Sequence, residues 1–132
     1  MSFTEVSDEI PVQPPVGGVS YTASGSIYKG QSIYLVADDK VKVPSDDNQI
    51  LYGIADYNKI DGQEILIYPV GNLVRCKISS STTLTAGTLV GCINGGYLSN
   101  TATYRSGAII TKAPSTNLGD GEVLILGHCY SI

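Results

Sequence analysis

The stretch IYKGQSIYLVADDKV at residues 27–41 has a counterpart of the same design further along the chain, LTAGTLVGCINGGY at residues 84–97. In both, an aliphatic residue precedes a glycine, and a run of mostly apolar residues then leads into a polar turn. Gly30 of the first stretch corresponds to Gly87 of the second, at an offset of 57 residues. A pattern that recurs at a near-constant spacing indicates a duplicated structural unit.

The correspondence continues on the C-terminal side of both stretches. The matching segments are 51–55 (LYGIA) with 106–110 (SGAII) and 61–67 (DGQEILI) with 120–125 (DGEVLI), which pair Gly53 with Gly107 and Glu64 with Glu122 at offsets of 54 and 58 residues. What repeats is glycines, aliphatic runs and turns, and no His, Cys or carboxylate cluster repeats with them. We therefore expect internal repeats at about 27–70 and 84–127, in a protein that binds or covers and does not catalyse.

From residue 19 onward, apolar and polar residues alternate with the period of a β-strand. The strands predicted from this pattern are 32–37, 40–43, 49–55, 63–70, 73–78, 88–93, 108–112 and 122–127. The turns predicted between them are Asp38-Asp39, 44–47, Asp61-Gly62, Asn94-Gly95-Gly96 and Asp120-Gly121, where Gly and Asn tolerate positive φ. No segment has a sustained helical period. We predict an all-β fold, a small β-barrel or sandwich built from two similar β units within one domain, 19–132. The units are related by a pseudo-two-fold axis or form adjacent halves of one barrel.

The first 18 residues have a different composition, with Pro11, Pro14 and Pro15 among isolated apolar residues. Proline fixes φ and removes a backbone donor, so this segment is neither a helix nor a central strand. We predict an extended N-terminal arm that docks on a partner; an ordinary frayed terminus is the alternative. The apolar residues that would anchor the arm are Phe3, Val6, Ile10 and Val12.

The composition argues against several classes of partner. The chain has 132 residues, 15% charged residues and a net charge of −4, and its eight basic residues are scattered, so we expect no nucleic-acid partner. The pairs Lys40/Lys42 and Arg75/Lys77 each indicate one solvated strand face. With nine Tyr and few charges, the surface suits close contact with another protein, although β proteins are in general rich in Tyr and Thr.

Candidate catalytic and metal-ligating residues are few. Cys76, Cys92 and Cys129 have wide, irregular spacing, which predicts reduced, buried thiols and no metal site or cofactor. His128 adjoins Cys129 on opposite faces of a strand, so the two do not form a direct Cys–His pair. Two aspartate pairs, 38/39 and 46/47, are candidate calcium ligands, but turn hydrogen bonding is the favoured interpretation. We expect no catalytic residues and no enzyme activity.

No apolar run has the length of a signal peptide core or of a membrane span, so we expect no membrane association and synthesis in a cytoplasm.

In its repeated unit, the chain resembles the bacteriophage capsid cement, or decoration, proteins. The matching elements are 84–87 (LTAG), 51–55 (LYGIA) and 121–125 (GEVLI), and the resemblance covers about residues 27–127. It implies a small β-barrel protein that attaches to the major capsid protein on the outside of an assembled head, made in the host cytoplasm and assembled as a homotrimer. The Pro-rich arm and the many Tyr depart from that pattern and indicate instead the capsid-anchored base of a head fibre.

A second class of function remains open from the sequence. Exposed Tyr residues also suit a carbohydrate- or receptor-binding β module, such as part of a head fibre. The absence of Trp argues against this alternative.

Overall fold

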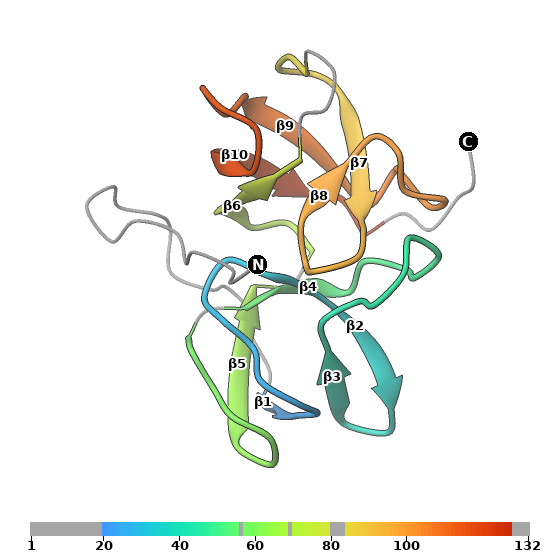
Figure 1. Ribbon diagram of the computed structural model, residues 1–132, viewed down its shortest axis with the longest axis vertical. Helices are drawn as coiled ribbons and strands as arrows, with labels where there is room; N and C mark the ends of the chain where they lie inside the picture. Colours follow the sequence, from blue (N-terminus) through green and yellow to red (C-terminus); the bar gives the residue numbers. More distant parts are fainter. Residues whose placement is uncertain (1–19, 56, 69, 80–83, 128–132) are drawn as a thin grey trace.

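The computed structural model describes residues 20–55, 57–68, 70–79 and 84–127, and this part of the chain contains strands, turns and loops but no helix. The strands close into two separate five-stranded barrels, with β1–β5 in the lower half of Figure 1 and β6–β10 in the upper half. The predicted all-β fold with two similar units is confirmed. Each unit closes a barrel of its own, so the two are not halves of one barrel.

The first barrel is formed by short strands in the order β1-β3-β2-β4-β5. Their bounds are β1 Ser20–Ala23, β2 Ser32–Ala37, β3 Lys40–Lys42, β4 Gly53–Ala55 and β5 Glu64–Tyr68. The pair β1–β3 is parallel, and the other pairs are antiparallel, including β1–β5, which closes the barrel.

The second barrel repeats this topology strand for strand, in the order β6-β8-β7-β9-β10. Its strands are β6 Leu73–Ile78, β7 Leu89–Cys92, β8 Leu98–Ser99, β9 Ala108–Lys112 and β10 Gly119–Ile125. The parallel pair is now β6–β8, and β6 closes the barrel against β10. Each barrel therefore begins with a strand, β1 or β6, that lies before the predicted repeat.

Equivalent turns have the same backbone conformation in the two barrels. Gly30 and Gly87 both have φ +92°, and their N–H groups donate to equivalent carbonyls in β4 and β9. In the turns before β5 and β10, Gly62 and Leu118 both have positive φ, at 85° and 60°. The predicted equivalence of Gly30 and Gly87 is confirmed, and the shared positive φ explains why a glycine recurs there.

The strand ladders correct two of the predicted pairings. Ile33 lies opposite Gly53, and its equivalent Val90 lies opposite Ala108, so Gly53 corresponds to Ala108 and not to Gly107. Asp120 and Gly121, predicted as a turn, lie inside β10, and the turn falls at Asn117-Leu118 instead. The sequence misled here because Leu118 adopts a conformation that usually selects Gly or Asn.

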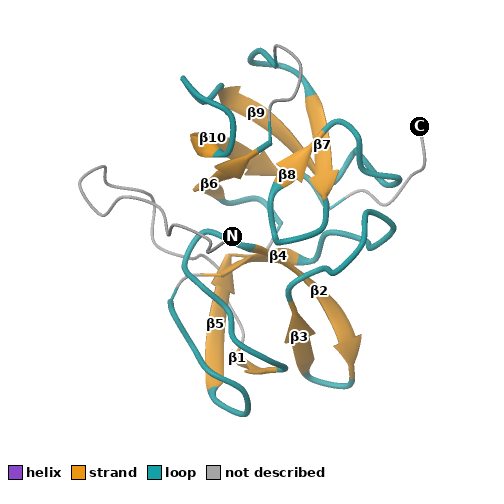
Figure 2. Cartoon of the chain, in the orientation of Figure 1, coloured by secondary structure: helices purple, strands orange, loops and turns teal. Residues whose placement is uncertain are grey.

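Aliphatic side chains from alternating strand positions fill both barrels (Figure 2). The buried cluster of the first barrel consists of Ala23, Ile27, Ile33, Val41, Ala55, Ile65 and Ile67. That of the second consists of Val74, Cys76, Ile78, Leu84, Val90, Cys92, Leu98, Ala108, Ile110, Val123 and Ile125, joined by Leu51, Ile54 and Tyr68 from the first half of the chain. The second core therefore continues across the boundary between the barrels.

The outer face of β6 differs from the prediction. Arg75 and Lys77 are only 8% and 7% exposed, although a solvated face was expected. In the ladder, Glu122 of β10 lies opposite Arg75 and Asp120 lies opposite Lys77, with which it forms an ion pair. Opposite charges directly across a strand pair stabilise the sheet, and these partners allow the two cations to be buried. The lysines of β3 are exposed, as predicted.

Two glycine substitutions separate close packing from backbone conformation. At Gly91, a Cβ atom would lie 1.9 Å from the carbonyl oxygen of Tyr104, whereas at Gly62 it would meet open space at φ +85°. We expect Gly91→Ala to lower the free energy of unfolding by about 3 kcal/mol and Gly62→Ala by about 1 kcal/mol. Urea denaturation measures both, and equal losses would contradict the close approach at Gly91.

Candidate binding surfaces

The residues predicted to anchor the arm, Phe3, Val6, Ile10 and Val12, lie outside the described residues, as do His128 and Cys129. Their predicted roles therefore stay predictions. Within the described residues, the surface features that suit binding are two concave sites and the exposed apolar side chains around them.

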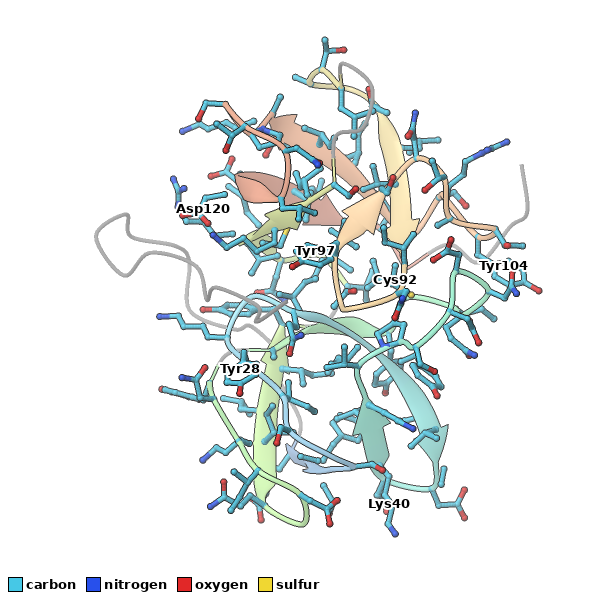
Figure 3. The ribbon with its side chains drawn as sticks, viewed as in Figure 1. Tyr28, Lys40, Cys92, Tyr97, Tyr104 and Asp120 are labelled. Carbon is cyan, nitrogen blue, oxygen red and sulfur yellow. The ribbon has the colours of Figure 1, made fainter. Side chains whose placement is uncertain are left out.

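The larger site is a groove of about 350 Å³ at the boundary between the barrels. Three segments form it: β2, the loop between β3 and β4, and the loop between β8 and β9, whose Tyr104 is labelled at the right of Figure 3. The lining residues are Tyr34, Leu35, Asn48, Gln49, Ile50, Tyr52 and Tyr104. We call this site the tyrosine groove. Because it takes residues from both repeats, it exists only in the assembled pair of barrels.

The groove lies where the two repeats differ. Tyr34 in β2 is equivalent to Gly91 in β7, since both lie opposite the equivalent residue of the next strand, Lys42 or Ser99. At Gly91 the missing side chain lets the Tyr104 carbonyl approach the barrel, as shown by the 1.9 Å that a Cβ atom would leave. In the first barrel the tyrosine projects from the strand, and loop 43–52 lies beside it. The equivalent place on the second barrel is thus covered by its own chain.

Hydrogen bonds hold the walls of the groove. The Asn48 N–H donates to Asp46 Oδ1 at 2.9 Å, and the Thr103 hydroxyl donates to Asn48 Oδ1 at 2.5 Å. The Asp47 carbonyl accepts from Thr103 N–H at 3.0 Å, and its Oδ1 accepts from Asn94 N–H at 3.0 Å. The predicted turn role of Asp46 and Asp47 is therefore confirmed, and these bonds connect the loop to the second barrel.

A pair of tyrosines fixes one wall. The rings of Tyr21 and Tyr52 are edge-to-face, with centroids 5.4 Å apart at 90°, and their hydroxyls are hydrogen-bonded. The hydrogen bond to Tyr52, followed by burial, raises the pKa of Tyr21 from 10.0 to about 12. Edge-to-face packing with a hydroxyl contact leaves the Tyr52 ring little freedom, so it offers a preformed surface to the groove.

The smaller site, of about 120 Å³, lies on the first barrel. It is lined by Ser26, Tyr28, Asn58, Lys59, Ile60 and Gln63. The Lys29 N–H donates to Asn58 Oδ1 at 2.8 Å, and the Ile60 N–H donates to Gln63 Oε1 at 3.0 Å. Next to it, Tyr57 is 57% exposed and Ile60 63% exposed. This surface combines apolar contact area with hydrogen-bonding groups, which is typical of protein contacts.

The two described cysteines are buried and free, as predicted. Burial raises the pKa of the Cys92 thiol to about 12 and that of Cys76 further above its ordinary value. Both thiols are protonated at neutral pH, so neither is an activated nucleophile. Among the described residues, no group of three or more His, Cys, Asp or Glu side chains is placed to hold a metal ion. The same part of the chain has no helix long and apolar enough to cross a membrane.

Comparison with known proteins gives one informative likeness. No family model matches the sequence, and no curated protein matches it significantly. The structure is similar to the crystal structure of the head fibre gp8.5 N base of bacteriophage phi29, with a TM-score of 0.61 and 11% identity, over 87% of this chain and 98% of that chain. At this identity the likeness shows a shared fold. It agrees with the head-fibre part of the resemblance found in the sequence, while membership of the cement family stays a prediction.

The sequence did not reveal the tyrosine groove. It showed that the chain is rich in Tyr, but Tyr34, Tyr52 and Tyr104 are far apart and belong to different repeats. One signal was present: where the repeats align, Tyr34 stands against Gly91. A large exposed aromatic residue facing a glycine in a duplicated unit marks a place where one copy has changed.

The tyrosine pair predicts a pH dependence. Because the folded-state pKa of Tyr21 lies above its ordinary value, its contribution to stability is fully present below about pH 10 and is lost as the pH rises toward 12. Tyr52→Phe removes the largest cause of the shift, so the pKa of Tyr21 should fall toward 10. NMR titration of labelled tyrosine ring carbons measures this. An unchanged titration in the variant would show that the two hydroxyls do not interact in solution.

The cysteines predict slow chemical modification. In the native protein at mildly alkaline pH, we expect iodoacetamide to leave Cys76 and Cys92 unmodified, because both are buried and protonated. Both should react quickly in urea. Peptide mass spectrometry after timed labelling measures each site separately, and rapid native labelling of either would contradict its burial.

Proposed function

We propose that this protein is a structural component of a phage virion, attached to the exterior of the capsid in the manner of a head-fibre base. The observation that carries the proposal is the extent of the structural likeness. The match takes in 98% of the head-fibre base and 87% of this chain, so it includes most of both barrels and not one common β module.

The physical character of the molecule supports this role. A protein that attaches to a shell needs a rigid body and contacts of modest strength that symmetry repeats, and it needs no chemistry. The two barrels are joined through a shared core, and both described thiols are unactivated. Exposed apolar residues on the first barrel, including Tyr28, Tyr57 and Ile60, provide contact area. We propose no enzymatic activity.

The major capsid protein is the proposed partner. The protein would be made in the host cytoplasm and would bind the expanded shell in preference to its precursor, which stabilises the expanded state by mass action. Attachment at a three-fold or quasi-three-fold position would suit a homotrimer. The arm, 1–18, would supply further contacts through Phe3, Val6, Ile10 and Val12, because its prolines lower the entropy lost on docking.

Co-sedimentation with purified phage heads tests the proposal. We expect the full chain to sediment with expanded heads at a fixed ratio to the major capsid protein and to bind precursor heads weakly. Deletion of residues 2–18 should weaken binding at least tenfold without unfolding the barrels. Native mass spectrometry of the free protein measures its oligomeric state.

A matched control keeps the length of the arm. Replacing Phe3, Val6, Ile10 and Val12 together with Ser removes the proposed anchors and leaves every proline in place. Loss of binding in both variants supports anchoring by the arm. Binding equal to that of the full chain in both would place attachment on the barrels, and no binding of the full chain to heads would reject the virion role.

A further inference from the structure

We propose that the tyrosine groove is a binding site for a neutral oligosaccharide, a function separate from attachment to the capsid. This inference does not rest on the virion role, because it is drawn from the lining of the groove alone. The groove has a volume of about 350 Å³, which lies within the range of about 300–1,000 Å³ usual for small-molecule sites. One or two sugar rings fit such a space.

The aromatic lining suits the apolar face of a sugar ring. Tyr34, Tyr52 and Tyr104 reach the groove from three different segments, so aromatic surface borders it on more than one side. A pyranose presents C–H groups on its faces, and these pack on aromatic rings, while its hydroxyls stay at the rim. Tyr suits this task because it joins a large apolar face to a polar tip. Leu35 and Ile50, 46% and 43% exposed, extend the apolar floor.

Hydrogen-bonding groups lie at the edge of this apolar surface. Because Asn48 Oδ1 accepts from the Thr103 hydroxyl, its Nδ2 atom is the part of the amide that can donate to a ligand. Gln49 Nε2 is 3.4 Å from both carboxylate oxygens of Asp46, a long contact that a sugar hydroxyl can replace. Few polar groups around an apolar pocket are what orient a small ligand.

The charge of the lining selects among sugars. The seven described residues that line the groove are all uncharged, so nothing there would offset the desolvation of an anionic or cationic ligand. The acidic side chains of the neighbouring turn, Asp46 and Asp47, further disfavour an anion. The groove therefore suits neutral sugars and disfavours sialylated sugars, nucleotides and phosphates.

The walls are positioned before any ligand arrives. Tyr52 is held by Tyr21, and the loop that carries Asn48 and Gln49 is bonded to the second barrel through Thr103 and Cys92. A preformed site loses little entropy on binding. A single shallow groove gives weak affinity, in the millimolar range, which several copies on one particle would strengthen through avidity.

NMR titration of the isotope-labelled full chain tests the site directly. The probes are cellobiose, maltose, lactose and N,N′-diacetylchitobiose, with sialyllactose as the charged partner of lactose. We expect at least one neutral probe to shift the amide signals around Tyr34, Asn48 and Tyr104, and sialyllactose to bind at least fivefold more weakly than lactose if lactose binds. No shift with any neutral probe at tens of millimolar, or preference for sialyllactose, would overturn the proposal.

Variants separate this groove from other tyrosines. Tyr34→Ala and Tyr104→Ala should each weaken binding at least tenfold, while Tyr34→Phe should retain most of it because the ring remains. Tyr57→Ala is the matched control, since Tyr57 is 57% exposed and lies outside the groove. Unfolding curves identify any variant that fails to fold, and the Phe variant then decides. Equal binding by Tyr34→Ala and the parent chain would overturn the proposal.

The two proposals can fail independently. Groove variants that lose sugar binding should still co-sediment with phage heads at the ratio of the parent chain. If instead they lose attachment to heads and no sugar binds, the groove is a capsid contact and the proposed saccharide site is wrong.

Discussion

The relative position of the two barrels depends on one turn. The turn between β7 and β8 lies against the first barrel, where Ser32 N–H donates to the Gly96 carbonyl at 2.8 Å and Gly95 N–H donates to the Pro44 carbonyl at 2.9 Å. Gly96 has φ +83°, and a Cβ atom there would lie 2.9 Å from Gln31 Cβ. Only glycine meets both conditions without strain. Because Tyr104 and the loop at 48–52 meet across this junction, the tyrosine groove depends on it as well.

The junction is made by segments that are not equivalent in the repeats. The β7–β8 turn of the second barrel docks on the first, while the β3–β4 loop of the first docks on the second, where Leu51 packs within 3 Å of the position that a Gly107 side chain would take. The two barrels therefore clasp each other head to tail. Duplicated units joined in this way must diverge, because each copy presents a different surface to its neighbour, and the groove is one product of that divergence.

The sequence predicted those features that are set locally. Gly30 and Gly87 recur because the turn requires positive φ, and the alternation of apolar residues gave the all-β class and most strands. It failed where the fold depends on distant partners. Arg75 and Lys77 looked solvated because strand period separates two faces but does not reveal that two carboxylates of β10 lie directly opposite. The groove was out of reach for the same reason, since three segments far apart in sequence make it.

A head-to-tail junction raises the question of why the chain stops at two barrels. The β2–β3 turn is the equivalent of the docking turn, and it lies at the far end of the first barrel, near Lys40 in Figure 3. Where the docking turn has Gly95 and Gly96, this turn has Asp38 and Asp39, and both aspartates are exposed. Docking it on another barrel would desolvate two carboxylates and force side chains into the space that glycine leaves open. The charged turn thus ends a geometry that would otherwise propagate, and it keeps the far end of the first barrel soluble and free for other contacts.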